Sequence, residues 1–467
     1  MPPSASRLWI REPRAVFSPE LDPALAAGGL VIEGERIAEL LPAGARPAAP
    51  VDEVLPAERC VLIPGLINTH HHFYQTLTRA FGPALNQPLF PWLAALYPVW
   101  AGLTAEMIRC STELALAELL LSGTTTAADH HYVFSDDLAD AIDLQVAAAQ
   151  SLGIRVVLTR GSMSLGQSQG GHPPDSIVQT EDAILEDSVR LLRAHHDPSP
   201  GAMVQIALAP CSPFSVTRDL LTASAELAAW ENVLLHTHLA ETIDEEAFCL
   251  ETTGSRPVEY LDQCGWLTDR TWFAHGIHFS AAEIETLGRA GCSVSHCPTS
   301  NMILSSGMCP VPELERAGVG VSLGVDGSAS NDCSNLMQEV RQALLLQRLR
   351  LAGGRSAEAE ALPTHADALR WGTAGGARAL RRPELGQIAV GAPADLALFN
   401  LDAPRFSGAD DPLAALVLCG AERAEHVFVN GAWRVRNGTI AGLDLERLLA
   451  RHSELALALV QRAEGVG

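Results

Sequence analysis

Pro64-Gly-Leu-Ile-Asn-Thr-His-His-His72 is an apolar run that ends in three consecutive histidines. Val61–Asn68 has the composition of a buried β-strand, so the histidines follow the point where that strand ends. Alternate residues of an extended chain point the same way, so His70 and His72 can face one point while His71 points away. Neutral imidazole binds Zn²⁺ or Fe²⁺ well, although an H-x-H pair alone is weak evidence for a metal site.

Seven further apolar runs are typical of strands, and Ala/Leu-rich helical patterns such as Thr104–Leu121 separate them. Eight strand–helix units over roughly 320 residues predict a (β/α)8 barrel spanning residues 63–385. We prefer a barrel to a doubly wound sheet because polar residues gather where several different strands end. The seven strands are Thr124–Asp129, Arg155–Arg160, Val204–Ala209, Val233–His238, Thr271–His275, Cys292–His296 and Gly320–Asp326.

The two ends of the chain have a sequence pattern that differs from that of the barrel segment. Gly29–Ile37 holds two apolar runs around a glycine turn, and Val427–Val435 carries Asn430-Gly431 between apolar runs, a strong hairpin signal. We therefore expect one small β-sandwich domain built from residues 1–62 and 386–442. The helical spacing of Leu and Ala near the C-terminus predicts a final helix within residues 443–467.

Composition excludes several classes of function. The chain has 467 residues and a net charge of −23, so neither nucleic acid nor an anionic membrane is an expected partner. All 32 basic residues are arginine, which excludes a Schiff-base lysine, a P-loop lysine and a carboxylated lysine bridging two metals. The ten cysteines form no C-x-x-C pair, and no signal peptide or long apolar segment is evident, which predicts a cytoplasmic protein.

Further polar residues stand at the ends of other predicted strands. His238 ends the fifth strand, Glu241 follows it by three residues, His275 ends the sixth and Asp326 ends the eighth. Each has a structural alternative: His275 as a core histidine and Asp326 as a turn residue. His236 shares a strand face with His238, so it too is a possible ligand. The strand ends of one barrel lie together, which favours a shared site over separate structural roles.

These motifs resemble the amidohydrolase superfamily, in its branch of mononuclear nucleobase deaminases. The resemblance extends over nearly the whole chain, including Pro393-Ala-Asp-Leu396. It implies one divalent metal ion, Zn²⁺ first and Fe²⁺ as the alternative. The family's binuclear branches need a carboxylated lysine, which this chain lacks. The implied metal ligands are His70, His72, His238 and Asp326.

The resemblance also implies catalytic roles. Glu241 matches the family's proton shuttle, and His275 matches a histidine that contacts the attacking water. We expect His275 and Asp326 to take a proton from that water, which the metal makes acidic. Glu241 would protonate the ring nitrogen beside the attacked carbon, and the exocyclic amine would leave as ammonia.

Four residues are predicted substrate contacts. Gln75 matches a glutamine that binds the purine edge in guanine-deaminase-like relatives, or is a helix-start residue facing water. Trp92, in the aromatic run Phe90–Trp100, can stack on a planar ring or belong to the core. Cys211 stands where guanine deaminases carry an arginine, which weakens guanine as the substrate. Arg160 is a partner for a substrate oxygen or a structural ion pair. We expect His130 and His131 to be loop residues.

Within the branch, the motifs are most similar to members that convert 8-oxoguanine to urate and ammonia. Guanine, isocytosine, a pterin and a hydroxy-s-triazine stay open as alternative small-molecule substrates, because all share an N–C(NH₂)–N unit. Amide or carbamate hydrolysis on the same barrel is a second class of activity, and a non-catalytic scaffold is a third. Family members are often homo-oligomers, so we expect the same here.

Overall fold

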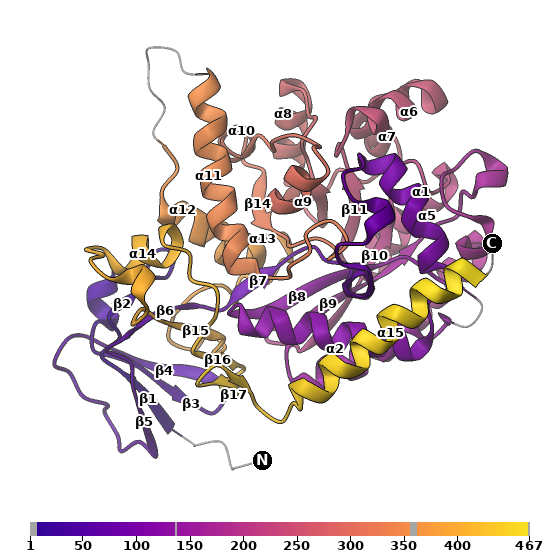
Figure 1. Ribbon diagram of the computed structural model, residues 1–467. Coiled ribbons are helices and arrows are strands. Elements are labelled where there is room, and N and C mark those ends of the chain that lie inside the picture. Colours follow the sequence, from indigo (N-terminus) through magenta and orange to yellow (C-terminus); the bar gives the residue numbers. More distant parts are fainter. Residues whose placement is uncertain (1–6, 136–137, 355–361, 466–467) are drawn as a thin grey trace.

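Eight parallel strands close into a barrel at the centre of the molecule (Figure 1). The computed structural model describes residues 7–135, 138–354 and 362–465. The barrel follows chain order from β7 to β14, and β14 pairs with β7 to close it. The predicted (β/α)8 fold is confirmed. The strands are β7 (Leu66–Asn68), β8 (Thr124–His131), β9 (Arg155–Ser162), β10 (Val204–Pro210), β11 (Leu235–Leu239), β12 (Thr271–His275), β13 (Ser293–His296) and β14 (Gly320–Leu323).

The prediction of one strand over Val61–Asn68 is wrong in one respect. The segment forms two strands, β6 (Cys60–Pro64) in a separate sheet and β7 in the barrel, and Gly65 joins them. A Cβ at Gly65 would lie 2.1 Å from the Thr125 hydroxyl oxygen, so a larger residue does not fit this crossing. An apolar run alone cannot show this division, because the strands on both sides of Gly65 are buried.

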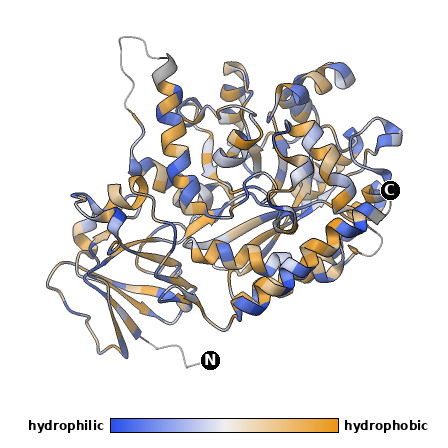
Figure 2. Cartoon of the chain, viewed as in Figure 1, coloured by the Kyte–Doolittle hydropathy of each residue, from blue (hydrophilic) through white to orange (hydrophobic). Residues whose placement is uncertain are grey.

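Helices cover the outside of the barrel, and Figure 2 shows hydrophobic and hydrophilic residues interleaved along these helices. The last helix, α15 (Leu445–Gly465), lies along α2 (Ala105–Leu121) and also contacts α1 (Leu89–Trp100) (Figure 1). No helix in the described ranges is long and apolar enough to cross a membrane. The other helices are α3 (Ala141–Leu152), α4 (Glu181–His195), α5 (Arg218–Glu231), α6 (Ile243–Thr253), α7 (Pro257–Gln263), α8 (Ala281–Ala290), α9 (Pro298–Ile303), α10 (Val311–Arg316), α11 (Leu336–Gly354), α12 (His365–Arg370), α13 (Gly376–Ala379) and α14 (Pro412–Leu418).

Two smaller sheets bring the chain ends together. One has the order β4-β3-β1-β5 and the other the order β18-β17-β16-β15-β6-β2, and one hydrophobic cluster contains residues of both. Both expected hairpins are present, and Asn430 (φ 51°) and Gly431 (φ 73°) form the turn of the second. The strands are β1 (Arg7–Arg11), β2 (Ala15–Val16), β3 (Gly29–Glu33), β4 (Arg36–Leu41), β5 (Glu53–Pro56), β15 (Leu396–Asn400), β16 (His426–Val429), β17 (Ala432–Arg436) and β18 (Thr439–Ile440).

A buried ion pair ties the six-stranded sheet to the barrel. Arg155, on β9, donates from Nε to Oδ2 of Asp395 at 3.1 Å and from Nη2 to Oδ1 at 3.2 Å. The Asn430 amide also donates to Asp395 Oδ1, at 2.7 Å. The side chains of both charged residues are almost fully shielded from solvent. Removing one partner would therefore leave the other charge buried without compensation.

We predict that Arg155→Met and Asp395→Asn each lower the free energy of unfolding by about 3–5 kcal/mol, as measured in urea titrations. The exposed pair between Arg289 and Glu285, at 3.9 Å, supplies the control. Arg289→Ala should cause a far smaller loss, because water screens that pair. Equal losses in the buried and exposed variants would contradict the assigned role of Arg155.

Candidate metal centre

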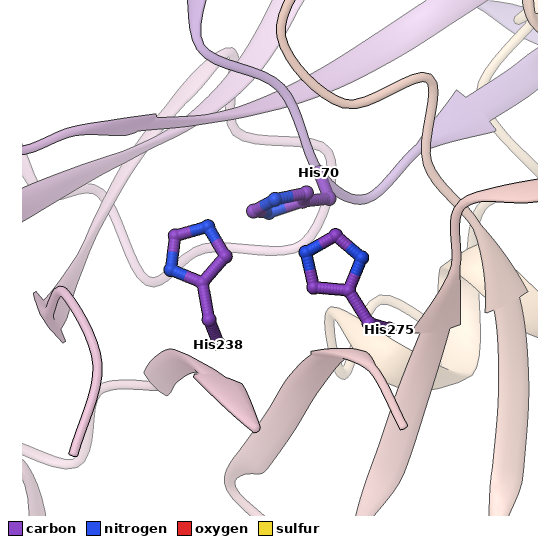
Figure 3. A group of neighbouring side chains, drawn as sticks. All are labelled: His70, His238 and His275. Atoms are coloured by element: carbon purple, nitrogen blue, oxygen red, sulfur yellow. The ribbon is translucent and has the colours of Figure 1, made fainter. Parts of the chain in front are cut away.

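The barrel gathers the predicted ligand residues at one end. His70 and His72 follow β7, His238 lies on β11, His275 ends β12, and Asp326 follows β14. These are the first, fifth, sixth and eighth strands of the barrel. Figure 3 shows the rings of His70, His238 and His275 turned toward a common space. Carboxyl ends of parallel barrel strands meet on one face, so residues far apart in sequence become neighbours.

The ligand atoms lie at a spacing that suits one metal ion. The Nε2 atoms of His72 and His238 are 3.2 Å apart, and Asp326 Oδ1 lies 3.3 Å from Nε2 of both His70 and His72. Four ligands each about 2.0–2.1 Å from a tetrahedral ion would lie roughly 3.3 Å from one another. His70 Nε2 is buried and has no hydrogen-bond partner among protein atoms. The donor set and its spacing therefore fit a divalent metal ion.

Hydrogen bonds at Nδ1 determine which nitrogen of each imidazole faces that point. His72 Nδ1 donates to the His130 carbonyl at 2.7 Å, and His238 Nδ1 donates to the Cys211 carbonyl at 2.6 Å. A carbonyl oxygen can only accept, so both rings carry their proton on Nδ1. The lone pair on Nε2 is left for a metal.

His236 fixes the proton of His70 on Nδ1 in the same way, with the His236 ring standing between His70 and a backbone carbonyl. Its Nδ1 donates to the Trp272 carbonyl at 2.8 Å, so its Nε2 is an acceptor. That Nε2 lies 2.8 Å from His70 Nδ1, which must therefore donate. His236 is thus engaged behind His70, whereas the sequence left it open as a ligand. His71 points away as expected, and its Nε2 lies 2.9 Å from the Ser334 hydroxyl.

Glu241 and His275 lie beside these ligand atoms. His275 Nε2 is 3.5 Å from Glu241 Oε2 and 4.0 Å from Asp326 Oδ2. Burial, with the negative charge of Asp326 added to it, raises the pKa of Glu241 well above its usual range. That shift favours the protonated carboxyl group over the carboxylate. Burial lowers the pKa of His275 to about 4, and Asn301 hydrogen-bonds to its Nδ1 at 3.0 Å.

Backbone strain marks two of these residues. His275 has φ of 72° and Asp326 has φ of 65°, in the left-handed region that residues other than glycine seldom adopt. Each such residue costs about 1–3 kcal/mol, which the surrounding structure has to offset. Ser300 donates to Asp326 Oδ2 at 2.6 Å and so fixes the carboxylate. Strain of this kind is typical of functional sites.

A pocket opens onto the same atoms, and Gln75, Trp92 and Cys211 are among the residues that line it. Gln75 is 1% exposed, so it does not face water, and its Oε1 has no hydrogen-bond partner in the protein. A Cβ at Gly327 would lie 1.9 Å from that oxygen, so glycine there leaves room for the amide. Burial raises the pKa of Cys211 to about 12, which keeps it a neutral thiol.

The structure corrects one of the predicted substrate contacts: Arg160 does not line this pocket. Its Nε donates to Asp187 at 2.5 Å and its Nη2 to Gln179 at 2.8 Å. The guanidinium also lies over the ring of Phe134, 3.8 Å from its centroid. The structural ion pair, which the sequence left open as an alternative, describes this residue.

Sequence reasoning missed several residues that shape the site. Tyr97, Tyr132 and Phe214 line the pocket, although Tyr97 stands inside the aromatic run already noted. His130 and His131 were expected in a loop, but both are buried in β8. The His130 ring stacks on His238 at 4.8 Å between centroids. The sequence did contain a signal for the longer strand, because His130 and His131 directly follow the predicted strand Thr124–Asp129.

Comparison with known proteins agrees with this geometry. A model of the amidohydrolase family matches residues 61–442. The chain is 59% identical to 8-oxoguanine deaminase of Pseudomonas aeruginosa strain PAO1, across 97% of this chain and 99% of that protein. It is 35% identical to an isoxanthopterin deaminase from an unknown prokaryote, across 87% of each.

A crystal structure of atrazine chlorohydrolase TrzN from Arthrobacter aurescens TC1, in complex with zinc, superimposes with a TM-score of 0.88. The two share 32% identity, and the match covers 96% of this chain and all of that one. The chain therefore belongs to the amidohydrolase family. It is a hydrolase that acts on C–N bonds of a small molecule, as the motifs predicted.

Buried histidines outside the ligand group predict the pH dependence of stability. An unfolded chain protonates these side chains below about pH 6.5, whereas the folded chain does not, so stability is lost as pH falls. Three buried carboxyls with pKa raised to about 7, Asp129, Glu245 and Glu339, act in the opposite direction but are fewer. Burial lowers the pKa to about 3 in His71, His131 and His296, and to about 4 in His426 and His452.

We expect the thermal unfolding midpoint of the metal-loaded protein to fall between pH 7 and pH 5. Calorimetry across this range measures it. His426→Gln, which removes one such group far from the site, should make the dependence shallower. A midpoint that rises on acidification would contradict the assignment.

Proposed function

We propose that this enzyme converts 8-oxoguanine to urate and ammonia by hydrolytic deamination. The observation that carries the proposal is the 59% identity to 8-oxoguanine deaminase over almost the full length of both proteins. The pocket adds support, because it presents the neutral thiol of Cys211 where guanine deaminases are expected to carry an arginine. Its aromatic walls suit a flat bicyclic ring.

We propose zinc as the metal, with His70, His72, His238 and Asp326 as its ligands. Three imidazole nitrogens and one carboxylate oxygen are donors that zinc prefers. The zinc complex of the structurally similar chlorohydrolase supports the same ion. When bound, the ion would act as a Lewis acid and lower the pKa of water at the site toward neutrality.

The proton transfers are assigned to three side chains: Glu241 donates a proton, and His275 and Asp326 accept one. Glu241 carries a proton and delivers it to the ring nitrogen beside the amine-bearing carbon. His275 and Asp326 accept a proton from the attacking water as the new C–O bond forms. The C–N bond to the exocyclic amine breaks, that nitrogen takes up a proton from these groups, and ammonia leaves. The new hydroxyl group returns its proton to Glu241 and becomes a carbonyl, which converts 8-oxoguanine into urate and restores the proton donor.

Gln75 and Trp92 would position the ring. The free Oε1 of Gln75 can accept a hydrogen bond from a ring N–H, and its Nε2 can donate. The indole N–H of Trp92 donates to the Ala329 carbonyl at 3.2 Å, so Trp92 presents the apolar face of its ring to the pocket. We also propose that the enzyme works in the cytoplasm, since none of its ten cysteines forms a disulfide.

An ammonia-release assay on the metal-loaded protein tests the substrate. We expect the highest kcat/KM with 8-oxoguanine in a panel that also contains guanine, isocytosine, isoxanthopterin and a hydroxylated aminotriazine. Faster turnover of another member would reject 8-oxoguanine as the substrate and leave deamination standing.

Glu241→Gln tests the proton donor. The amide cannot deliver the proton, so we expect kcat to fall by roughly 10²–10⁴-fold. Metal content should stay unchanged, because Glu241 is outside the proposed ligand set. A near-normal rate in this variant would refute the assigned role.

His72→Ala tests the metal site. Metal analysis by mass spectrometry should find about one divalent ion per wild-type chain and far less in the variant, since an ion held by four ligands loses one. His195→Ala is the control, because that ring pairs with Asp143 away from the pocket. Equal metal content in all three proteins would contradict the proposed ligands.

A further inference from the structure

Two buried carboxylates lie behind the site and hold backbone amides at its edge. Asp129 Oδ1 accepts from the Phe73 amide at 2.7 Å, directly after the proposed ligand His72. Glu245 accepts from the amides of Ala240 and Glu241, each at 2.9 Å. Neither carboxylate lines the pocket, so neither can touch a substrate there.

Glu245 closes a strained turn between β11 and α6. It lies in the first turn of α6, and its side chain reaches back to the residues that precede the helix. Ala240 has φ of 53°, a left-handed conformation that residues other than glycine seldom adopt. The Ala240 carbonyl also accepts from the amides of Ile277 and His278, each at 2.9 Å. The turn that carries Glu241 is therefore held from two sides.

Asp129 holds the histidine motif in a comparable way. It projects from β8, and its second oxygen, Oδ2, accepts from Gln145 Nε2 at 2.7 Å. Gln145 lies on α3, so the carboxylate connects the outer helix layer to the segment that follows β7. The Phe73 amide is the first one after His72, and its hydrogen bond restricts the backbone of that ligand.

The burial of these groups has an energetic cost that calls for a compensating role. Asp129 is 1% exposed and Glu245 is fully buried. Within residues 7–135, 138–354 and 362–465, no arginine or histidine forms an ion pair with either carboxylate. Removing a carboxylate from water is unfavourable when no cation accompanies it. Charge-assisted hydrogen bonds to backbone amides are the compensation that the structure offers.

We propose that Asp129 and Glu245 are positioning residues with separate targets: Asp129 orients the metal ligand His72, and Glu245 orients the proton donor Glu241. The inference rests on the proposed function, because it assigns each carboxylate to a group with a stated task. It goes beyond a general structural role, since it requires the two residues to affect different measurable properties.

Asp129→Asn and Glu245→Gln preserve size and remove the charge, and Glu246→Gln is the matched control. Glu246 pairs with Arg256 on the outside of the same helix. We expect Glu245→Gln to retain its metal and lose roughly 10²-fold in kcat, a loss typical of a displaced catalytic group, with KM nearly unchanged. Asp129→Asn should weaken metal binding by about 10–100-fold, with kcat recovering when metal is in excess.

A double-mutant cycle separates positioning from a loss of general stability. In the Glu241→Gln background, Glu245→Gln should cause no further loss of kcat, because the group that it orients is already removed. Losses that multiply in the double variant would overturn the proposal for Glu245. Unchanged metal affinity in Asp129→Asn would overturn it for Asp129.

Amide hydrogen exchange provides a readout that does not depend on the substrate. The amides of Phe73, Ala240 and Glu241 should be protected in the wild-type protein, and each should lose protection only in its own variant. Rapid exchange at these amides in the wild type would reject the hydrogen bonds themselves. If no compound in the panel is deaminated, the proposed function fails, while metal affinity and exchange still decide the positioning roles.

Discussion

The metal centre depends on where three imidazole rings place their Nδ1 protons. His72 and His238 donate to backbone carbonyls, and His70 donates to His236, whose own proton goes to a third carbonyl. Each of these carbonyls lies on, or directly after, a neighbouring barrel strand. Closure of the barrel thus sets the tautomer and the direction of every ring, and a looser sheet would leave them free to rotate.

Burial gives the surrounding groups their chemistry. Burial beside Asp326 raises the pKa of Glu241 well above its usual range, and burial raises the pKa of Cys211 to about 12. In water the Glu241 carboxyl would be ionised near neutral pH and could not serve as a proton donor. The cost of this environment is offset by hydrogen bonds behind the site, including those of Asp129, Glu245 and Ser300.

Much of the fold could be predicted because its signals are local. Strand composition, the alternation of strands with helices and the Asn430-Gly431 turn each depend on neighbouring residues, and the structure agrees with them. The division of Val61–Asn68 at Gly65 could not be predicted, since it depends on Thr125 lying against that glycine. The burial of His130 and His131 was missed because a strand end extended further than its apolar run.

The sequence by itself determined which candidate site residues the chain carries and their order along it. These are the histidines after the first strand, His238, Glu241, His275 and Asp326, with no lysine anywhere. Tertiary structure alone decided which nitrogen of each ring faces the metal position, that His236 supports rather than competes with His70, and that Arg160 turns to Asp187. The reason is physical. A ligand's identity is a property of one residue, whereas its orientation depends on hydrogen-bond partners that lie on other strands, tens to hundreds of residues away.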